Sequence, residues 1–431
     1  MNEAVSLERI DRAIAAIDAE IAGIVDGVLH DEAFQALEAA WRGLAYVVDR
    51  VDFHENTEVA VWSYSKKELE DDFADHVDVT ETRFFGSVYT AEYGQHGGRP
   101  YGAVLANWSA TAAPPEVELL RRVASVAAMA HAPVLLAASP ELLGVRDFSE
   151  LPAMTHPEAA FEPPAGTRWA SFRGIEDSRY VGILFPRMLL RLPYRDEGAE
   201  RFVYEERVEG PRHYLWGSPI FAFAVRMADS FARYRSYAGI LGMVDDRPAV
   251  LDAHPALGPA HPKPPVEVVL SRRLEQAFSE HGFIPLTWDP IRATLRFTTA
   301  NSVQTPRSYG LTDGGPSATL SHLLGTRLPY LLLASRFAHY LKVLERERIG
   351  AHRESVEIER ELGEWLSKYV VVMDSPSPAT RLKYPLRNAR VKVTDVEGSA
   401  GVHRMEVLIQ PHLRYMRQAF TLSVAGRLEA R

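Results

Sequence analysis

The sequence of 431 residues contains no cysteine. A disulfide framework, a thiolate metal site and a cysteine nucleophile are therefore excluded. Positive charge is also scarce, because 48 lysines and arginines stand against 57 aspartates and glutamates and leave a net charge of −9. Nucleic-acid binding depends on basic side chains that neutralise phosphates, so we expect no nucleic-acid partner.

Long hydrophobic runs are lacking as well. The longest one, residues 123–138, is too short to span a membrane and is interrupted by His131 and Pro133. The N-terminal residues carry acidic side chains and lack the apolar centre of a signal peptide. We therefore expect a cytoplasmic protein without membrane insertion.

The short motifs of common enzyme classes are absent too. The patterns G-x-x-x-x-G-K-[ST], G-x-G-x-x-G, H-E-x-x-H and G-x-S-x-G do not occur. Ser63 to Lys66 match S-x-x-K, but the S-D-N and K-T-G that accompany it in serine acyl enzymes are missing. Residues 94–98 are glycine-rich but precede a strand, which favours a turn over a phosphate cradle. We expect no catalytic residue, no cofactor and no metal ligand.

A dense group of basic residues lies in residues 335–350, S-R-F-A-H-Y-L-K-V-L-E-R-E-R-I-G. As a helix, this segment places Phe337, Leu341 and Leu344 on one apolar stripe. The basic side chains lie mostly off that stripe, and two glutamates neutralise part of their charge. The pattern indicates a packed helix rather than a site for phosphate or nucleic acid.

What the chain does contain is a set of patterns typical of α/β proteins. Its length exceeds what one hydrophobic core usually holds. A strand at 101–108, a helix with prolines at its start at 114–132 and a strand at 133–139 predict a right-handed βαβ unit. Further strands are predicted at 58–64 and 179–186. We expect an N-terminal helical hairpin (1–52), a central mixed or parallel sheet with helices (53–325) and a C-terminal part with a small sheet module (326–431).

The N-terminal segment has the most regular apolar pattern. Apolar residues recur there at steps of four and three, at Ile10, Ile14, Ile17, Ile21, Ile24 and Val28. This spacing is typical of the narrow seam of a coiled coil. Asp31 can cap a second helix that completes the hairpin. The seam packs either on its own domain or on another chain, and the spacing leaves both open; the candidate contact residues are Ile10, Ile14, Ile17 and Ile21.

Short alternating strands are predicted near the C-terminus, in residues 389–396, 403–411 and 418–428. The outermost strand of such a module presents an unpaired backbone edge, which another strand can join. The candidate interface residues of this module are Arg390, Val391, Val393, Met405, Val407 and Ile409.

Several long segments resemble one protein family in the same order along the chain. They include F-Q-A-L-E-A-A-W-R-G-L-A-Y-V-V, S-F-R-G-I-E-D-S-R-Y-V-G-I-L-F-P-R-M-L-L-R-L-P-Y, L-P-Y-L-L-L-A-S-R-F-A-H-Y-L-K-V-L-E-R-E-R-I-G and P-L-R-N-A-R-V-K-V. The family is that of the large sheath subunits of type VI secretion systems, called TssC, VipB or EvpB. The resemblance extends over nearly the whole chain.

This resemblance implies a structural role in a contractile sheath and no enzymatic activity. Members of the family pair with a small sheath subunit, TssB or VipA, and polymerise with other copies of themselves around a tube of Hcp on a baseplate. Contraction propels the tube, and the ClpV ATPase then takes the sheath apart. Neighbouring subunits are linked when their strands add to the C-terminal strands of the large subunit.

Two features differ from the usual family pattern. Members generally carry a longer N-terminal extension, which supplies a linker strand and in some cases a helix for ClpV. Here only a few residues precede Leu7. We therefore expect a shortened or paralogous member, for which recycling by ClpV is an open question. A glycine-rich stretch of the family is replaced here by residues 239–250, a loop variation without expected consequence.

In a sheath that surrounds a tube, the charged helix predicted at residues 355–369 is a candidate tube-facing element. Val356, Leu362 and Trp365 are expected to anchor it, which leaves Glu357, Glu361, Glu364 and Lys368 pointing outward. The simpler interpretation is a helix face in solvent.

Two alternatives to the contractile sheath subunit remain at this stage. One is a non-contractile sheath paralogue. The other is a cytosolic α/β enzyme with an unrecognised active site at the carboxyl ends of the central strands, near Asn107 and Ser139. The absence of a convergent set of acid, base and nucleophile speaks against the enzyme.

Overall fold

The computed structural model describes residues 7–162, 166–195, 204–241, 243–244, 247–248, 250–252, 264–292, 294–310, 314–346, 355–373, 375–395, 402–412 and 422–429. The helices are α1 (Leu7–Leu29), α2 (Glu32–Val48), α3 (Lys66–Asp75), α4 (Arg83–Phe85), α5 (Ala91–Tyr93), α6 (Pro114–Ala130), α7 (Thr167–Arg173), α8 (Ile220–Tyr234), α9 (Arg272–Glu280), α10 (Gly315–Gly325), α11 (Leu328–Arg346), α12 (Ser355–Ser367) and α13 (Pro378–Lys383). The strands are β1 (Val104–Ala110), β2 (Val134–Ala138), β3 (Val181–Phe185), β4 (Met188–Arg191), β5 (Leu215–Gly217), β6 (Met243–Val244), β7 (Arg247–Pro248), β8 (Val250–Asp252), β9 (Phe283–Asp289), β10 (Thr294–Phe297), β11 (Leu386–Asp395), β12 (Val402–Pro411) and β13 (Leu422–Glu429).

A mixed sheet forms the centre of the molecule. Its strand order is β1-β2-β3-β9-β10-β8. Strands β1, β2, β3 and β9 are parallel to one another, and β10 is antiparallel to both β9 and β8. The unit of β1, α6 and β2 confirms the predicted βαβ arrangement, because β1 and β2 pair in parallel.

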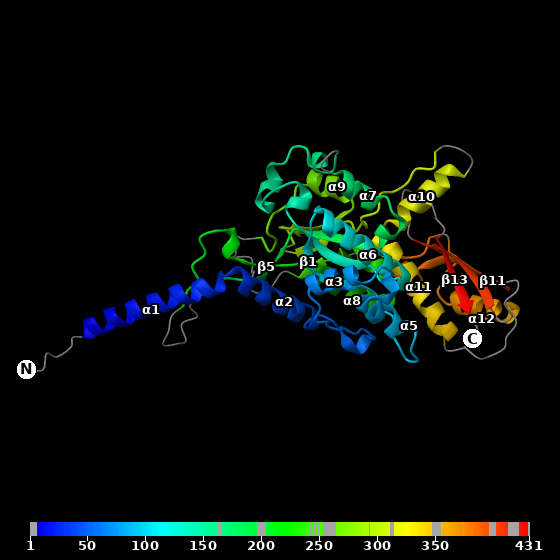
Figure 1. Cartoon of the computed structure of the whole chain (residues 1–431), viewed down its shortest axis with the longest axis horizontal. Coiled ribbons are helices and arrows are strands. Elements are labelled where there is room, and N and C mark those ends of the chain that lie inside the picture. Colours follow the sequence, from blue (N-terminus) through cyan, green and yellow to red (C-terminus); the bar gives the residue numbers. More distant parts are fainter. Residues whose placement is uncertain are drawn as a thin grey trace, which may run out of the picture.

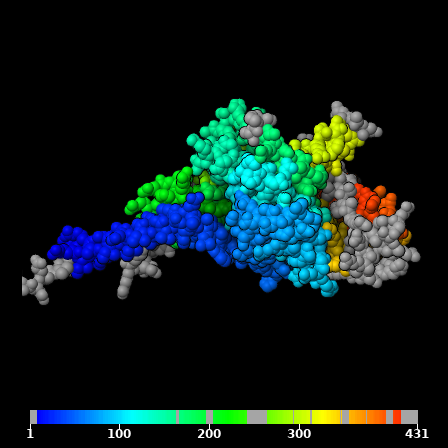
Figure 2. Space-filling model, viewed as in Figure 1, coloured from blue at the N-terminus to red at the C-terminus, as the bar shows by residue number. Residues whose placement is uncertain are grey.

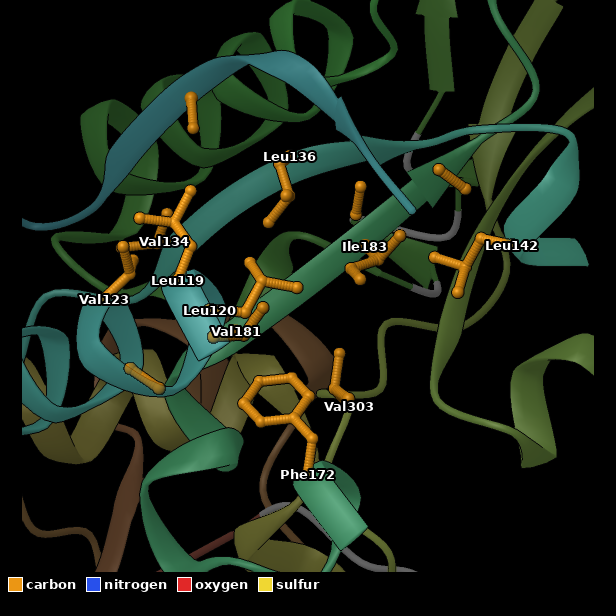
Figure 3. Packing of buried hydrophobic residues seen from close by; sticks show 14 of the residues in the cluster. Leu119, Leu120, Val123, Val134, Leu136, Leu142, Phe172, Val181, Ile183 and Val303 are labelled. Carbon is orange, nitrogen blue, oxygen red and sulfur yellow. The ribbon is translucent and has the colours of Figure 1, made fainter. Parts of the chain in front are cut away.

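The sheet separates two hydrophobic cores, since successive side chains of a strand point to opposite faces. Leu136 of β2 and Ile183 of β3 lie with Leu120 of α6 in one core (Figure 3). Leu135 of β2 and Leu184 of β3 belong to the other core, with residues of α2, α8 and the first half of α11. Every residue of β2 and β3 is therefore buried.

The two N-terminal helices form an open hairpin. As predicted, Asp31 caps α2, because its side chain accepts a hydrogen bond from the backbone N–H of Phe34 at 3.0 Å. Ser6, a residue type that often caps helices, precedes α1 and lies outside the described residues. Instead of folding back along α2, α1 projects away from the body of the molecule (Figures 1 and 2). None of the side chains of α1 described by the structure is buried.

The buried attachment of the hairpin to the central domain is made by α2. Its buried residues are Gly43, Tyr46 and Val47. A Cβ atom at Gly43 would lie 2.2 Å from the ring of Phe221 in α8, so the absence of a side chain allows the two helices to approach closely.

The strand predicted at residues 58–64 is absent. Residues 57–65 adopt no helix, strand, turn or bend, and residues 58–63 are exposed. Alternation alone predicted the strand, but no other strand of the described chain lies beside it. A β-strand needs a partner for its backbone groups, which the period of the side chains does not reveal.

The basic residues of α11 serve packing. The ring of His339 contacts the carbonyl oxygen of Ala130 through Nε2 at 3.1 Å, and the ammonium of Lys342 donates to that of Met129 at 3.3 Å. Both acceptors lie in the last turn of α6, where carbonyl groups lack helical partners. Arg346 donates in the same way to Glu92 and Gly98. Burial lowers the pKa of His339 well below its usual value, so this histidine is neutral.

The C-terminal strands form the predicted small module. They make a three-stranded antiparallel sheet in the order β11-β12-β13. The second half of α11, with Phe337 and Leu341, forms a third core with α12 and this sheet. Because its first half belongs to the central domain, α11 connects the two parts of the protein.

Candidate assembly surfaces

The seam of α1 is exposed along its whole length. Its apolar residues keep between 40% and 64% of their surface accessible; they are Ile10, Ile14, Ile17, Ile21, Ile24 and Val28. Six large aliphatic side chains lie on this helix face. Keeping them in water costs roughly 25 cal/mol of free energy for each Å² of exposed apolar surface. The sequence left open whether this seam packs inside the chain. Among the described residues nothing covers it.

The apolar stripe continues onto α2. The sequence pattern predicts one apolar face of this helix, made of Phe34, Leu37, Trp41, Leu44 and Val48. All of these residues except Leu44, which is partly buried, are exposed. Trp41 alone keeps 64% of its surface accessible. The helix is attached to the body through its less apolar side at Gly43. Both helices thus present apolar side chains outward, which is typical of a protein–protein contact.

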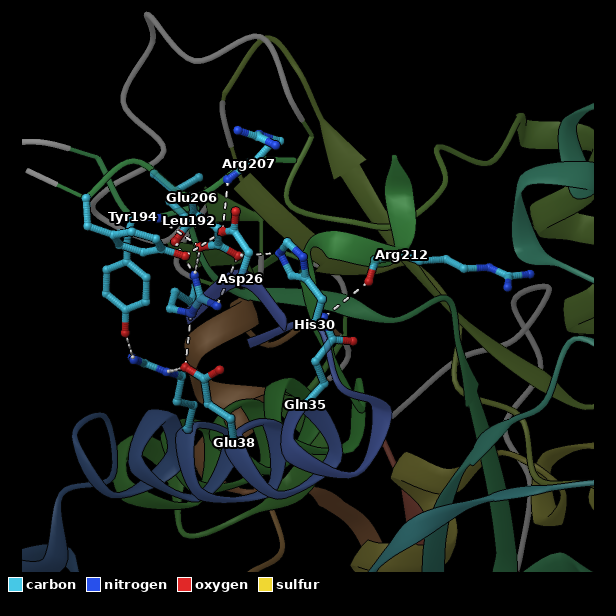
Figure 4. Close-up of polar contacts among 12 residues, drawn as sticks. Asp26, His30, Gln35, Glu38, Leu192, Tyr194, Glu206, Arg207 and Arg212 are labelled. Atoms are coloured by element: carbon cyan, nitrogen blue, oxygen red, sulfur yellow. Dashed lines mark hydrogen bonds and ion pairs between the residues drawn. The ribbon is translucent and has the colours of Figure 1, made fainter. Parts of the chain in front are cut away.

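A network of charged side chains fixes the joint between α1, α2 and the body (Figure 4). Arg191 at the end of β4 donates through Nε to Glu38 of α2 at 3.0 Å and through Nη1 to Glu206 at 2.5 Å. Glu206 also contacts the ring of His30, which lies in the turn between the two helices, at 3.2 Å. In the last turns of α1, Asp26 accepts a hydrogen bond from the hydroxyl of Tyr204 at 2.7 Å.

The centre of this network is almost completely buried. The side chain of Arg191 is 6% exposed and that of Glu206 is fully covered. Burial disfavours the charge of Arg191, but the hydrogen bonds and the charge of Glu206 outweigh it and raise the pKa of the guanidinium. A buried pair of this kind has a defined geometry, because each partner left alone would be an uncompensated charge. The network therefore sets the angle at which α1 leaves the body.

The candidate residues of the C-terminal sheet divide between its two faces. The side chains of Val393, Met405, Val407 and Ile409 are buried in the core under α12, with Val391 partly buried beside them. Arg390 points to the exposed face. Four of the six side chains are thus unavailable to a neighbour, and what this sheet offers is a backbone edge.

The sheet has two outer strands, β11 and β13, and the contacts along the edge of β11 are described by the structure. β12 is the central strand, since it pairs with β11 on one side and β13 on the other. At its start β11 exchanges hydrogen bonds with residues 369–371 through Leu386. Near its end, the backbone N–H of Val393 donates to the carboxylate of Glu359 in α12 at 2.9 Å. The N–H of Val393 therefore faces away from β12, and by alternation so does that of Val391.

The proposed tube-facing helix has the expected orientation with one exception. Ile358, Leu362 and Leu366 of α12 face the core. Trp365 lies against the rings of Phe337 and Tyr369. Val356 is not an anchor, because 73% of its surface is exposed. Glu357, Glu364 and Lys368 are exposed and Glu361 is partly exposed, as the pattern predicted.

The residues named for an enzyme site show no catalytic arrangement. Asn107 is exposed on β1, and the hydroxyl of Ser139 accepts a hydrogen bond from the backbone N–H of Leu142 at 3.3 Å. A cleft of about 910 Å³ lies elsewhere, beside α9 and β10, and its lining includes Arg272, Arg296 and Arg327 but no histidine. His131 is partly buried and contacts the hydroxyl of Tyr180 at 3.1 Å.

No cluster of three or more potential metal ligands occurs in the described part of the chain. None of its described helices is both long and apolar enough to cross a membrane.

Comparison with known families matches almost the whole chain. Residues 11–304 match the EvpB/VC_A0108 tail sheath N-terminal domain, and residues 317–428 match the EvpB/VC_A0108 tail sheath gpW/gp25-like domain. The chain is also 35% identical over 430 residues to the type VI secretion system sheath protein TssC1 of Pseudomonas aeruginosa. That alignment covers 97% of this chain and 85% of the relative.

Two solved structures show a more distant likeness. One is the baseplate of the anti-feeding prophage, at 8% identity and a TM-score of 0.35, which covers 65% of this chain and 56% of the other. The second is a sheath tail protein of Listeria innocua, at 8% identity and a TM-score of 0.26, which covers 73% of this chain and 60% of the other.

Proposed function

The chain belongs to the EvpB/VipB tail-sheath family and is a structural subunit of the contractile sheath of a type VI secretion system, and we propose that it acts there through protein contacts alone. The exposed isoleucine seam of α1 is the observation that carries this proposal. A helix held out from the body by a buried charge network, with its apolar side bare, is a docking element. Neither the α/β enzyme nor the non-contractile paralogue is favoured.

The partner at the seam is the small sheath subunit, of the TssB or VipA type. A coiled-coil-like spacing calls for a helix on the other side. A second contact is the edge of β11, to which a strand from a neighbouring subunit would add. Together these contacts would build a helical polymer around the Hcp tube on its baseplate, in the cytoplasm. Contraction needs no chemistry in this chain, because two packings of the same subunits can differ in free energy.

We expect the chain to aggregate when it is produced alone and to become soluble when it is produced with the small sheath subunit. The seam and the strand edge are both bare in the isolated chain, and such surfaces associate non-specifically. Size-exclusion chromatography with light scattering measures the outcome. A monodisperse, stable monomer at high concentration would argue strongly against the proposed role.

We further propose that the acidic face of α12 contacts the tube. Replacing Glu357 and Glu361 by lysine is expected to weaken co-sedimentation with the tube protein, and the difference should shrink as salt rises. At 0.1 M salt the Debye length is about 10 Å, so contacts between exposed charges are sensitive to ionic strength.

The same number of charge reversals at Asp71 and Asp75, on α3, provides the control. Both residues are exposed, and the pair changes the net charge of the chain by the same amount. If the α12 variant and the control sediment with the tube equally well at low salt, α12 has its charged face in solvent.

A further inference from the structure

Residues 57–65 form an unusual surface segment. The segment starts after Asn56, which has a left-handed backbone, and ends at Ser65, the N-cap of α3. Between these points the chain has no turn or bend, so it runs extended. Six successive residues, 58–63, are exposed.

The backbone of this segment makes no hydrogen bond within the described protein. No N–H or C=O group of residues 57–64 bonds to another backbone group of the described chain. Exposed backbone groups of this kind bond to water, and a run of them along an extended segment can accept another strand, as the edge of a sheet does.

The segment is nevertheless held in place by its side chains. Glu58 forms an ion pair with Arg99. The ring of Trp62 lies edge-on to that of Tyr101, with 5.1 Å between their centres. At the far end, the hydroxyl of Tyr64 donates to the carboxylate of Asp72 at 2.6 Å.

Its apolar side chains are left in water. Val59 and Val61 keep 38% and 66% of their surface accessible. The two residues alternate with Glu58, Ala60 and Trp62, which is the period of a strand. The segment thus has the sequence of a β-strand, an extended and anchored backbone, and free hydrogen-bonding groups.

We propose that residues 57–64 pair with a β-strand contributed by the small sheath subunit. This inference rests on the proposed function and adds a contact distinct from the α1 seam and the β11 edge. Eight residues at about 3.3 Å each offer a ladder of roughly 26 Å. A helix or a flat apolar surface would cover the two valines but would leave the backbone groups unpaired. An incoming strand would cover the valines with its side chains and pair with the backbone groups.

A strand from a second copy of this chain is a poorer occupant. The described strands of the chain already lie in its own sheets. Pairing of residues 57–64 with themselves requires a two-fold axis, and such a contact closes into a dimer instead of extending a helical polymer.

A proline scan tests the proposal on the co-expressed pair of this chain and its small sheath subunit. Successive N–H groups of a strand point to opposite sides, so only every second one can face the incoming strand. The variants are Val59→Pro, Ala60→Pro and Val61→Pro. Proline suits an extended backbone, and no internal hydrogen bond of the described chain is removed, so circular dichroism and thermal unfolding should match the wild type.

Strand pairing predicts an alternating result. In one case, Val59→Pro and Val61→Pro each weaken the affinity for the small sheath subunit about 100-fold, and Ala60→Pro leaves it nearly unchanged. In the other case, Ala60→Pro weakens this affinity and the two valine variants leave it nearly unchanged. Equal effects at all three positions, whether neutral or severe, would overturn the proposal and leave the sheath function intact. A wild-type pair that does not co-purify would contradict the proposed function itself, and this inference with it.

Discussion

A chain that carries Ile17→Asp and Ile21→Asp is expected to lose its partner subunit and to keep its own fold. Both isoleucines are exposed in the isolated chain, at 56% and 40% of their surface, so the new carboxylates remain in water there. In the assembled seam the same carboxylates would be desolvated, at a cost on the order of several kcal/mol each. Since 1.4 kcal/mol is a factor of ten, the affinity should fall more than about 100-fold.

The opposite face of the same helix provides a matched control. Ala15 and Ala19 are exposed and lie about half a turn away from the seam, at 100° per residue. Ala15→Asp with Ala19→Asp adds the same charge to the same helix and should leave co-purification with the small subunit unchanged. The measurements are co-purification for binding and circular dichroism for the fold.

Two results would refute the seam as the partner contact. If the Ile17 and Ile21 variant unfolds while the control does not, the seam packs on its own chain. If both variants still co-purify with the partner, the small subunit binds elsewhere.

The sequence predicts well those parts of the fold that depend on local pattern. The βαβ unit around α6 and the three C-terminal strands are present where alternation and proline placement put them. In both cases the partner element is close in sequence, so a local pattern carries most of the information. The resemblance to the sheath family likewise rests on continuous segments.

Burial against distant or external surfaces is harder to predict. On α2 the most apolar stripe, which includes Trp41, faces outward, and the helix is attached through Gly43 because a glycine lets Phe221 approach. Residues 58–64 have the pattern of a strand but no partner in the described chain. In each case an apolar pattern is the same whether the covering surface belongs to this chain or to another one.

For the candidate sites, too, the sequence reveals the local pattern but not the surface that covers it. The spacing of the isoleucines identifies the seam of α1 but not its exposure, because the covering surface is not part of the local pattern. For the C-terminal module the sequence identifies the correct strands and gives no strand order. Val407 is thus a candidate interface residue by sequence, although it lies in the central strand of the sheet and its side chain is 1% exposed.

The second large effect is expected at the β11 edge of that sheet. Val391→Pro removes a backbone N–H that faces away from β12, as the hydrogen bond from Val393 to Glu359 indicates. The ladder between β11 and β12 keeps its donors, so the module should fold. A strand from a neighbouring subunit would lose a donor and meet the proline ring, a penalty of roughly 3 kcal/mol or more at each subunit contact.

We expect Val391→Pro to block filament formation and to spare the pair with the small subunit, because the α1 seam is untouched. Length distributions in negative-stain images measure polymerisation, and co-purification measures the pair. Arg390→Ala and Lys392→Ala, whose side chains lie on the exposed face, should polymerise normally. Val407→Pro would break the sheet internally and is a poor probe of the edge.

The distinction between backbone and side chain makes this prediction specific to strand addition. An ordinary side-chain interface on the exposed face of β11 would respond to Arg390→Ala and Lys392→Ala and tolerate Val391→Pro. Strand addition requires the reverse, because affinity comes from main-chain hydrogen bonds. Val391→Pro filaments of wild-type length would show that subunits are linked elsewhere, whereas short or absent filaments with an intact pair would place the link at the edge of β11.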